Sequence, residues 1–329
     1  MPRHVEFEQT GGPEVLRFVE AEVPAPAAGE VRIAVKAIGL NRAESLYRSG
    51  TYIIDPVFPA RLGSEAAGIV DAVGPGVAGL ARGDRVAVVP AFSYHDYGMY
   101  GDLVLAPARA IARLPEDLGW IDAAAVWMAY VTAWGALIDT AKLAAGETVL
   151  IPAASSSVGL AAIQVARRVG AIPVALTRTS AKADALRKQG AAHVIATEEA
   201  DLVAEVERIT RGGGARVAFD PVGGPGFARL VAATATRGTI LVYGALDPRE
   251  TPLPVGEVLG RSLTVRGYLL YEATCDDAKL AAAKAFVLDG LASGELRPRI
   301  DRTFPFEQIV EAHRYLEANG QIGKIVVTV

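Results

Sequence analysis

The segment Val149-Leu-Ile-Pro-Ala-Ala-Ser-Ser-Ser-Val-Gly159, continued by Leu160-Ala-Ala-Ile-Gln-Val-Ala-Arg-Arg-Val169, decides the fold of this 329-residue chain. It predicts a short apolar strand, a turn of small residues and the start of a helix. Backbone N–H groups at a helix N-terminus have no intrahelical partner and lie at the positive end of the helix dipole, so they bind anions such as phosphate. The segment therefore predicts a phosphate-binding turn, and a dinucleotide is the expected ligand.

The small residues of this turn match the dinucleotide fingerprint only in part. The fingerprint is Gly-x-Gly-x-x-Gly, whereas this chain has Ala154-x-Ser156-x-x-Gly159. Small residues still let a pyrophosphate approach, and serine hydroxyls can donate to phosphate oxygens, here from Ser155, Ser156 and Ser157. By itself, the same stretch also fits an ordinary strand-to-helix turn with a serine cap.

Strand and helix patterns alternate after this first unit. They cover residues 173–177, 181–189, 193–196, 200–210, 217–220, 227–234 and 239–244. Such alternation is typical of a parallel sheet with helices on both faces. The sequence therefore predicts an α/β fold with a Rossmann-type doubly wound parallel sheet domain over residues 121–264.

The end of the second predicted strand favours NADPH over NADH. An NAD site usually has an acidic residue about 20 residues after the glycines, which accepts from the ribose 2′-hydroxyl. Here no carboxylate appears before Asp184, whereas Arg178, Ser180 and Lys182 provide two cations and a hydroxyl for a 2′-phosphate. The alternative is that these residues only begin an exposed helix.

Composition predicts a cytoplasmic protein of about two domains. The formal net charge of −4 gives no basic field for nucleic acid. The N-terminus lacks the basic-then-apolar order of a secretory signal, and the longest apolar run, residues 123–138, is too short for the roughly 20 residues of a membrane helix. The single cysteine, Cys275, fits a reducing compartment. We therefore expect no membrane and no nucleic acid among the partners.

Residues 1–120 predict a mostly β module, because alternating runs such as residues 31–37 are separated by Gly and Pro turns. After residue 264, a strand, two helices and a last strand over residues 324–329 follow. We expect this last strand to return to the N-terminal module, so that residues 265–329 complete a discontinuous domain.

Several motifs together resemble the medium-chain dehydrogenase/reductase superfamily and, within it, the zinc-free quinone oxidoreductase branch related to zeta-crystallin. The motifs are Gly39-Leu-Asn41-Arg-Ala-Glu-Ser-Leu-Tyr47-Arg-Ser-Gly50, residues 62–70, residues 73–86, residues 153–159 and the closing Gly323-Lys324-Ile-Val-Val. The resemblance covers essentially the whole chain. It implies a discontinuous, GroES-like catalytic domain, a nicotinamide cofactor held in a cleft between the domains, and a homodimer joined through edge strands of the cofactor domains.

The sequence departs from the zinc alcohol dehydrogenases of the same superfamily. Their Gly-His-Glu, which supplies a metal-binding histidine, is here Gly63-Ser64-Glu65, and the cysteine expected near Asn41 is absent. A catalytic zinc site needs about three N, S or O ligands from the protein. We therefore predict that no metal is bound.

The resemblance also implies site residues. On the catalytic side it indicates Asn41, Tyr47, Tyr52 and Ser64, with Tyr52 and Asn41 as polar contacts to a substrate carbonyl or to the cofactor amide. On the cofactor side it indicates Thr132 at the nicotinamide, Val158 and Gly159 in the turn, Lys324 near the phosphates, and Gly244, Ala245 and Leu246 at the end of the sixth strand.

These residues predict hydride transfer from NADPH to a small molecule, a quinone or a related α,β-unsaturated carbonyl. Such acceptors delocalise the charge that hydride delivery creates, so they need no metal. A tyrosine, with a pKa of about 10, can donate a proton afterwards, but the loop over residues 92–100 adds three more phenols, and the sequence does not identify the donor. The alternatives are an enoyl-thioester (enoyl-CoA or carrier-protein) reductase, with Arg42, Arg48 and Arg61 near the substrate, and an NADPH-binding protein with a structural or RNA-related role.

Overall fold

A computed structural model describes residues 1–329, and the chain divides into two compact units. Unit 1 comprises Met1–Met128 and Pro298–Val329, and unit 2 comprises Ala129–Arg297. The divisions therefore lie later in the chain than residues 120 and 264, where we predicted them. The difference arises because strand β14 (Thr264–Gly267) pairs with β13 (Thr234–Val242) as part of the sheet of unit 2. Residues 265–297 thus extend unit 2 instead of completing the catalytic domain.

Unit 2 alternates strands and helices along the chain. Its other strands are β9 (Thr148–Ile151), β10 (Ile172–Thr177), β11 (His193–Ala196) and β12 (Ala215–Asp220). Its helices are α3 (Trp127–Trp134), which starts at the division, η3 (Gly135–Thr140), α4 (Ser157–Arg168), η4 (Ser180–Lys182), α5 (Ala183–Lys188), α6 (Leu202–Thr210), α7 (Phe227–Ala233), α8 (Val255–Gly260), α9 (Tyr271–Thr274) and α10 (Asp277–Ala292).

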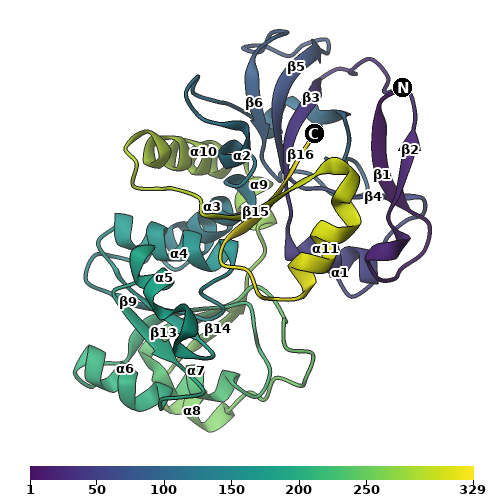
Figure 1. Ribbon diagram of the computed structural model, residues 1–329. Helices are drawn as coiled ribbons and strands as arrows, with labels where there is room; N and C mark the ends of the chain where they lie inside the picture. Colours follow the sequence, from purple (N-terminus) through teal and green to yellow (C-terminus); the bar gives the residue numbers. More distant parts are fainter. The chain divides into compact units, whose positions relative to one another are not determined.

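The six strands of unit 2 form one parallel sheet in the order β11-β10-β9-β12-β13-β14. Helices α4 and α5 lie on one side of the strands, and α6, α7 and α8 lie on the other (Figure 1). All residues of β9 are buried, as expected for a strand covered on both faces. The doubly wound sheet that we predicted is confirmed. The strand order reverses between β9 and β12, and such switch points are where sheets of this type bind ligands.

Unit 1 is mostly β structure. Its strands are β1 (Arg3–Phe7), β2 (Arg17–Glu20), β3 (Glu30–Gly39), β4 (Ala60–Arg61), β5 (Ala66–Val73), β6 (Arg85–Val88), β7 (Leu103–Pro107), β8 (Ile111–Arg113), β15 (Ile300–Pro305) and β16 (Lys324–Thr328). Its helices are η1 (Pro13–Val15), α1 (Arg42–Ser49), η2 (Ala108–Ala110), α2 (Trp120–Ala123), η5 (Phe306–Gln308) and α11 (Ile309–Glu317).

A seven-stranded sheet organises unit 1, and β3 is its centre. The order is β15-β16-β3-β5-β6-β8, and β7 also pairs with β3; β2, β1 and β4 form a separate three-stranded sheet. Along β3, Val31, Ile33 and Val35 are buried at every second position, which is the period of a strand. As predicted, β16 returns to this sheet and pairs antiparallel with β3, Val327 lying opposite Ile38. No helix of the chain has the length and apolar character needed to cross a membrane.

Candidate functional site

The turn between β9 and α4 brings the predicted phosphate-binding residues together. Ser156 is the N-cap of α4, and its hydroxyl accepts from the Gly159 N–H at 3.0 Å. A Cβ at Gly159 would lie 2.7 Å from the carbonyl oxygens of Ala153 and Ala154, which are backbone atoms that cannot move aside. Gly159 therefore lets α4 approach the strand end closely. Ser155, Ser157 and Val158 are half-buried in the same turn.

The end of β10 places its cations beside this turn. Lys182 donates from Nζ to Oγ of Ser155 at 3.3 Å, so it links the end of β10 to the β9–α4 turn. Arg178 is exposed. The Ser180 N–H donates to Oε1 of Glu199 at 2.9 Å. Glu199 was not identified from the sequence, because it lies 19 residues away on the far side of β11.

Gly244, Ala245 and Leu246 follow β13, which is the fifth strand of the sheet and not the sixth as we predicted, because β14 is the sixth. The Leu246 N–H donates to the Pro221 carbonyl at 3.0 Å, so this segment lies beside the end of β12. There Asp220 is fully buried and accepts from the N–H groups of residues 222 and 223. Burial raises the pKa of its carboxyl. Thr132 is buried within α3.

In unit 1, the start of α1 forms around Asn41 and Glu44. Asn41 is the N-cap, and its N–H donates to Oε2 of Glu44 at 2.8 Å, the return contact of a capping box. Glu44 is completely buried, and it also accepts from the Ser64 N–H and the Ser64 hydroxyl, each at 2.9 Å, and from the Tyr100 hydroxyl at 2.7 Å. Burial raises the pKa of Glu44, and these hydrogen bonds oppose the rise.

Three tyrosines gather next to Ser64. The Tyr94 hydroxyl lies 2.7 Å from the Ser64 hydroxyl. The Tyr94 ring stacks on Tyr47 with centroids 4.8 Å apart and meets Tyr52 edge-on at 6.0 Å. Tyr47 is buried, and burial raises its pKa. The structure thus brings Asn41, Tyr47, Tyr52 and Ser64 into one region of unit 1, with Tyr94 among them.

Lys324 is buried among charged and polar groups of unit 1. Its ammonium forms an ion pair with Glu65 and donates to Oδ1 of Asn41 at 2.6 Å. Both charged side chains are buried, at 2 % and 0 % exposure. The second Glu65 oxygen accepts from the Met128 N–H at 2.9 Å. The partners that the structure gives Lys324 are therefore groups of unit 1, and its contact with the cofactor phosphates stays a prediction.

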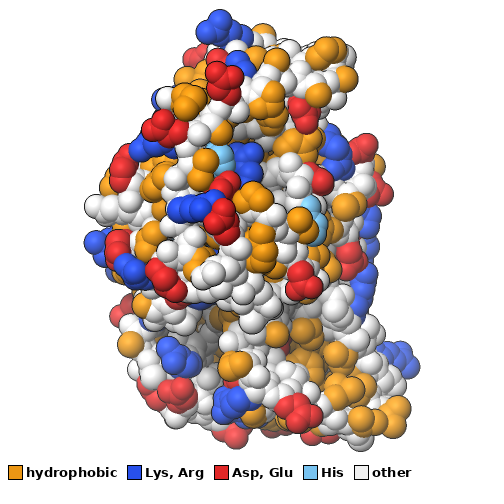
Figure 2. All heavy atoms as spheres, turned by 90° about the vertical axis from the view of Figure 1, so that its right-hand side faces the viewer, with side chains coloured by type: hydrophobic (Ala, Val, Ile, Leu, Met, Phe, Trp, Pro, Cys, Tyr) orange, Lys and Arg blue, Asp and Glu red, His pale blue; other side chains and the backbone are white.

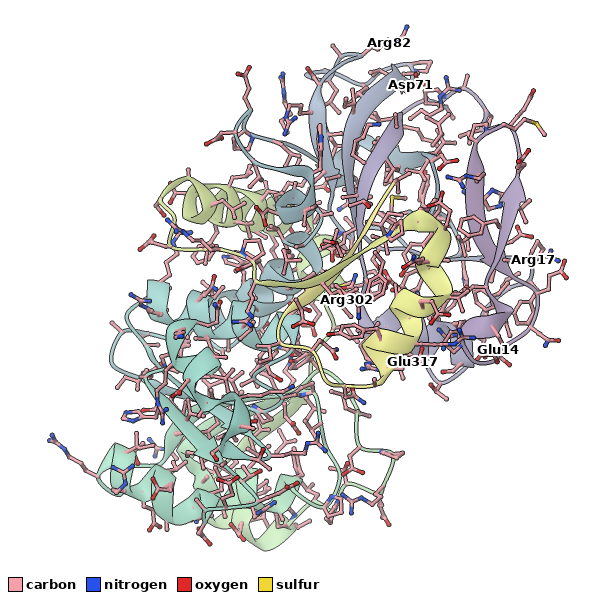
Figure 3. All side chains as sticks on the ribbon, in the orientation of Figure 1. Glu14, Arg17, Asp71, Arg82, Arg302 and Glu317 are labelled. Carbon is pink, nitrogen blue, oxygen red and sulfur yellow. The ribbon has the colours of Figure 1, made fainter.

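A buried histidine adjoins the other side of Tyr100. His313 of α11 lies 3.1 Å from the Tyr100 hydroxyl through Nε2, and Arg48 of α1 donates to its Nδ1 at 2.8 Å. Arg48 also donates at 2.6 Å to Glu317, which is labelled at the end of α11 in Figure 3. Burial lowers the pKa of His313 to about 3, and the charges of Arg48 and Arg42 add to the effect. The imidazole is therefore neutral at physiological pH.

Sequence reasoning missed Glu44, Glu65, Tyr100 and His313 as parts of this network. The three-residue spacing from Asn41 to Glu44 is a capping-box signal and could have indicated Glu44. His313 carries no such local signal. Nε2 of His95 lies 2.8 Å from the carbonyl oxygen of Asp55. No three His, Cys, Asp or Glu side chains of the chain are grouped so that they could hold a metal ion.

Two family models match the chain. Residues 27–116 match the alcohol dehydrogenase GroES-like domain, and residues 157–285 match a family described as zinc-binding dehydrogenase. The first match lies in unit 1 and the second in unit 2.

Relatives and solved structures match over nearly the full length. The human quinone oxidoreductase is 30% identical over 332 residues, covering 99% of this chain and 97% of the relative. The crystal structure of Escherichia coli quinone oxidoreductase complexed with NADPH has a TM-score of 0.90 at 31% identity and covers 99% of this chain and 100% of the other. The structure of an NAD-dependent alcohol dehydrogenase has a TM-score of 0.91 at 32% identity and covers 99% of both chains. This chain belongs to the medium-chain dehydrogenase/reductase superfamily, in its quinone oxidoreductase branch.

Proposed function

We propose that this oxidoreductase transfers a hydride from NADPH to a quinone or a related α,β-unsaturated carbonyl without a metal ion. The observation that supports it most directly is the β9–α4 turn, which lies where the strand order of a parallel sheet reverses and has Gly159 where a larger residue would collide with backbone. The similarity to a quinone oxidoreductase complexed with NADPH also supports this function.

The residues after β10 support NADPH as the cofactor. Arg178, Ser180 and Lys182 would contact a 2′-phosphate, and Lys182 already reaches Ser155 of the phosphate-binding turn. The pyrophosphate would be held by the β9–α4 turn, that is, by Ser155, Ser156, Ser157, Val158 and Gly159. The nicotinamide would lie toward Thr132, Gly244, Ala245 and Leu246. When bound, the reduced nicotinamide supplies the hydride. The protein's part is to orient the two reactants and to stabilise the negative charge on the acceptor oxygen.

A cofactor titration tests this assignment. We expect Arg178→Asp to weaken NADPH binding by roughly 10-fold or more, since one charge-assisted hydrogen bond is worth about 1.5–3 kcal/mol, and to leave NADH binding nearly unchanged. Arg211→Asp, an exposed arginine at the end of α6, is the matched control. Dissociation constants from nicotinamide fluorescence provide the measurement. Equal losses for both cofactors would contradict a role of Arg178 at the 2′-phosphate.

The polar groups of unit 1 support a conjugated acceptor. Without a metal, the acceptor itself must delocalise charge, and hydroxyls such as those of Tyr52 and Tyr94 can donate to its oxygen. The enoyl-thioester alternative requires free cations for a phosphorylated carrier. Arg48 pairs with Glu317, and Arg42 donates to Leu316 and Asn319 of the chain. Two of the three arginines therefore have partners of their own, and the comparison of crotonyl-CoA with 1,4-benzoquinone turnover distinguishes the substrates.

We also propose a homodimer formed through β14. This strand pairs with β13 on one side, ends the sheet on the other, and has all four residues exposed. Unit 2 also exposes several apolar side chains, and apolar side chains gather at the lower right of Figure 2. Those of unit 2 are Leu246, Leu253, Val255, Leu259, Val265 and Leu269. Unpaired edges of this kind pair with another strand unless they are blocked.

Light scattering after size exclusion tests the dimer. We expect the wild-type chain to have twice the 34.4 kDa mass of the chain, and Val265→Lys to reduce it to one chain. Val57→Lys, at an exposed valine of unit 1, should leave the mass unchanged. A monomeric wild-type chain at micromolar concentration would contradict the proposal.

A further inference from the structure

A continuous chain of hydrogen bonds connects Tyr94 to a buried carboxyl group. The Ser64 hydroxyl lies 2.7 Å from the Tyr94 hydroxyl and 2.9 Å from Oε1 of Glu44. All three residues are buried. A hydroxyl can donate and accept at the same time, so Ser64 can pass a proton between the carboxyl group and the phenol. This is the arrangement of a short proton relay.

Glu44 differs from the other buried charged groups around it because no cation contacts it. The neighbouring cations have carboxylates of their own: Lys324 of β16 pairs with Glu65, and Arg48 of α1 pairs with Glu317 of α11. On the remaining side, Tyr100 donates to Glu44, and the imidazole of His313, which contacts the Tyr100 hydroxyl, is neutral.

The lack of a paired cation therefore works against the ionised form of Glu44. Burying a charge that has no paired cation is costly, so such a group tends to be neutralised. Burial accordingly raises the pKa of Glu44, against the hydrogen bonds from Tyr100, Asn41 and Ser64 and the more distant charge of Lys324. A neutral Glu44 can donate to Ser64, and Ser64 can then donate to the Tyr94 hydroxyl oxygen.

We propose that Tyr94 is the proton donor to the reduced acceptor and that Glu44, through Ser64, supplies the proton that replaces it. The proposal rests on the function proposed above. Hydride transfer leaves a negative charge on the acceptor oxygen. The O–H bond of Tyr94 then breaks as an O–H bond forms on the acceptor, Ser64 gives its proton to the Tyr94 oxygen, and Glu44 gives its proton to Ser64. Glu44 ends as a carboxylate, and solvent returns one proton along the chain after the product leaves.

The contacts of the neighbouring phenols favour Tyr94 as the donor. Tyr97 of the same loop donates to Glu30 at 2.8 Å, and Tyr100 donates to the opposite oxygen of Glu44. Tyr94 instead lies against Tyr52, which the sequence indicated as a polar contact to substrate or cofactor, and against Tyr47, which it placed on the same catalytic side. It is thus the phenol that connects the predicted substrate region to the buried carboxyl.

Turnover of a graded set of quinones tests the donor. The acceptors are 1,4-quinones whose reduced oxygens differ in basicity. We expect Tyr94→Phe to lower kcat by roughly 10²- to 10⁴-fold, and the loss to grow with the basicity of the reduced oxygen, because a weakly basic oxygen needs no donor. Ser64→Ala should lower kcat less, and Ser64→Thr should restore it. Tyr97→Phe, which removes a phenol-to-carboxylate hydrogen bond from the same loop, should leave kcat unchanged.

The pH dependence of the rate and the affinity for NADPH distinguish a role in proton transfer from a purely structural role of Tyr94 and Ser64. The wild-type rate of reduction should fall as pH rises through the pKa of Glu44, and Ser64→Ala should abolish that pH dependence. NADPH dissociation constants should be equal in all variants. If Tyr97→Phe loses as much activity as Tyr94→Phe, or if the Tyr94→Phe loss is independent of acceptor basicity, the donor assignment is wrong.

Infrared spectroscopy tests the carboxyl group without any turnover. We expect the folded wild-type chain at neutral pH to show the C=O stretch of a buried protonated carboxyl, and Glu44→Gln to lack it. If Glu44→Gln does not fold, Ser64→Ala should shift the frequency of the same band, because it removes a hydrogen bond from that group. Absence of the band refutes the proton supply by Glu44. A wild-type chain that shows the band but reduces no acceptor would refute the proposed function, and with it the donor role of Tyr94.

Discussion

Replacement of Lys324 by methionine should destabilise unit 1 strongly. Methionine keeps much of the aliphatic chain but removes the ammonium, so Glu65 is left as a fully buried carboxylate without its cation. Two donors to Glu65 remain, the Met128 N–H at 2.9 Å and the Asn41 amide at 3.1 Å. Removing one partner of a buried ion pair costs about 3–5 kcal/mol. The two remaining donors place the expected loss near the lower end of that range.

The expected loss corresponds to a large shift in thermal unfolding. At about 2–4 °C per kcal/mol for a domain of this size, a loss of about 3 kcal/mol should lower the Tm of Lys324→Met by roughly 6–12 °C. Circular dichroism melting and urea unfolding would measure it. Glu65→Gln should also destabilise, and the double variant should lose less than the sum of the two single losses, because no unpaired charge then remains.

An exposed ion pair of the same unit provides the control. Arg314 and Glu311 are neighbours on α11, with side chains 51% and 56% exposed. Arg314→Met should cost under about 1 kcal/mol, as exposed pairs generally do. If Lys324→Met costs no more than Arg314→Met, or if the double variant shows additive losses, the reasoning from burial is refuted.

Three further predictions concern pH and the cofactor turn. Burial lowers the pKa of His313 to about 3, so between pH 6.5 and 3 the unfolded chain binds more protons than the folded chain. The free energy of unfolding should therefore fall as pH falls through this range. In urea titrations, His313→Gln should weaken this pH dependence. Burial alone would raise the pKa of Asp102, but hydrogen bonds from Arg3 hold it below 3.8. The stability that this pair contributes should be lost as pH falls through that lowered value. An Asp102→Asn variant that loses stability at acid pH just as the wild type does would contradict this. Gly159→Val should destabilise unit 2 by about 1–3 kcal/mol and weaken NADPH binding in a fluorescence titration, since its Cβ would collide with Ala154; unchanged binding would exclude the turn from the cofactor site.

The sequence by itself determined the class of fold and the position of the β9–α4 turn. Strands buried on both faces and helices of regular apolar period are encoded locally, and the structure confirms their alternation through unit 2. The cap of α4 by Ser156 is likewise a local feature. The return of β16 to β3 was also predicted, but from the resemblance and the order of elements and not from a local pattern.

The division between the units required the tertiary structure. A short strand such as β14 has the same local pattern whether it extends one sheet or begins another domain, and only its pairing with β13 shows that it belongs to unit 2. The boundary predicted at residue 264 therefore placed it with the wrong unit.

Only the tertiary structure decided the partners of the buried charges. The ammonium of Lys324 contacts Glu65 and Asn41, which lie 259 and 283 residues away in the sequence. His313 similarly joins Tyr100 across 213 residues. A buried charge must find its partner wherever packing brings one within reach, and packing between distant segments leaves no periodic signal in the chain. For this reason the sequence indicated Asn41, Ser64 and the tyrosines one by one, while the fold joined them to Glu44.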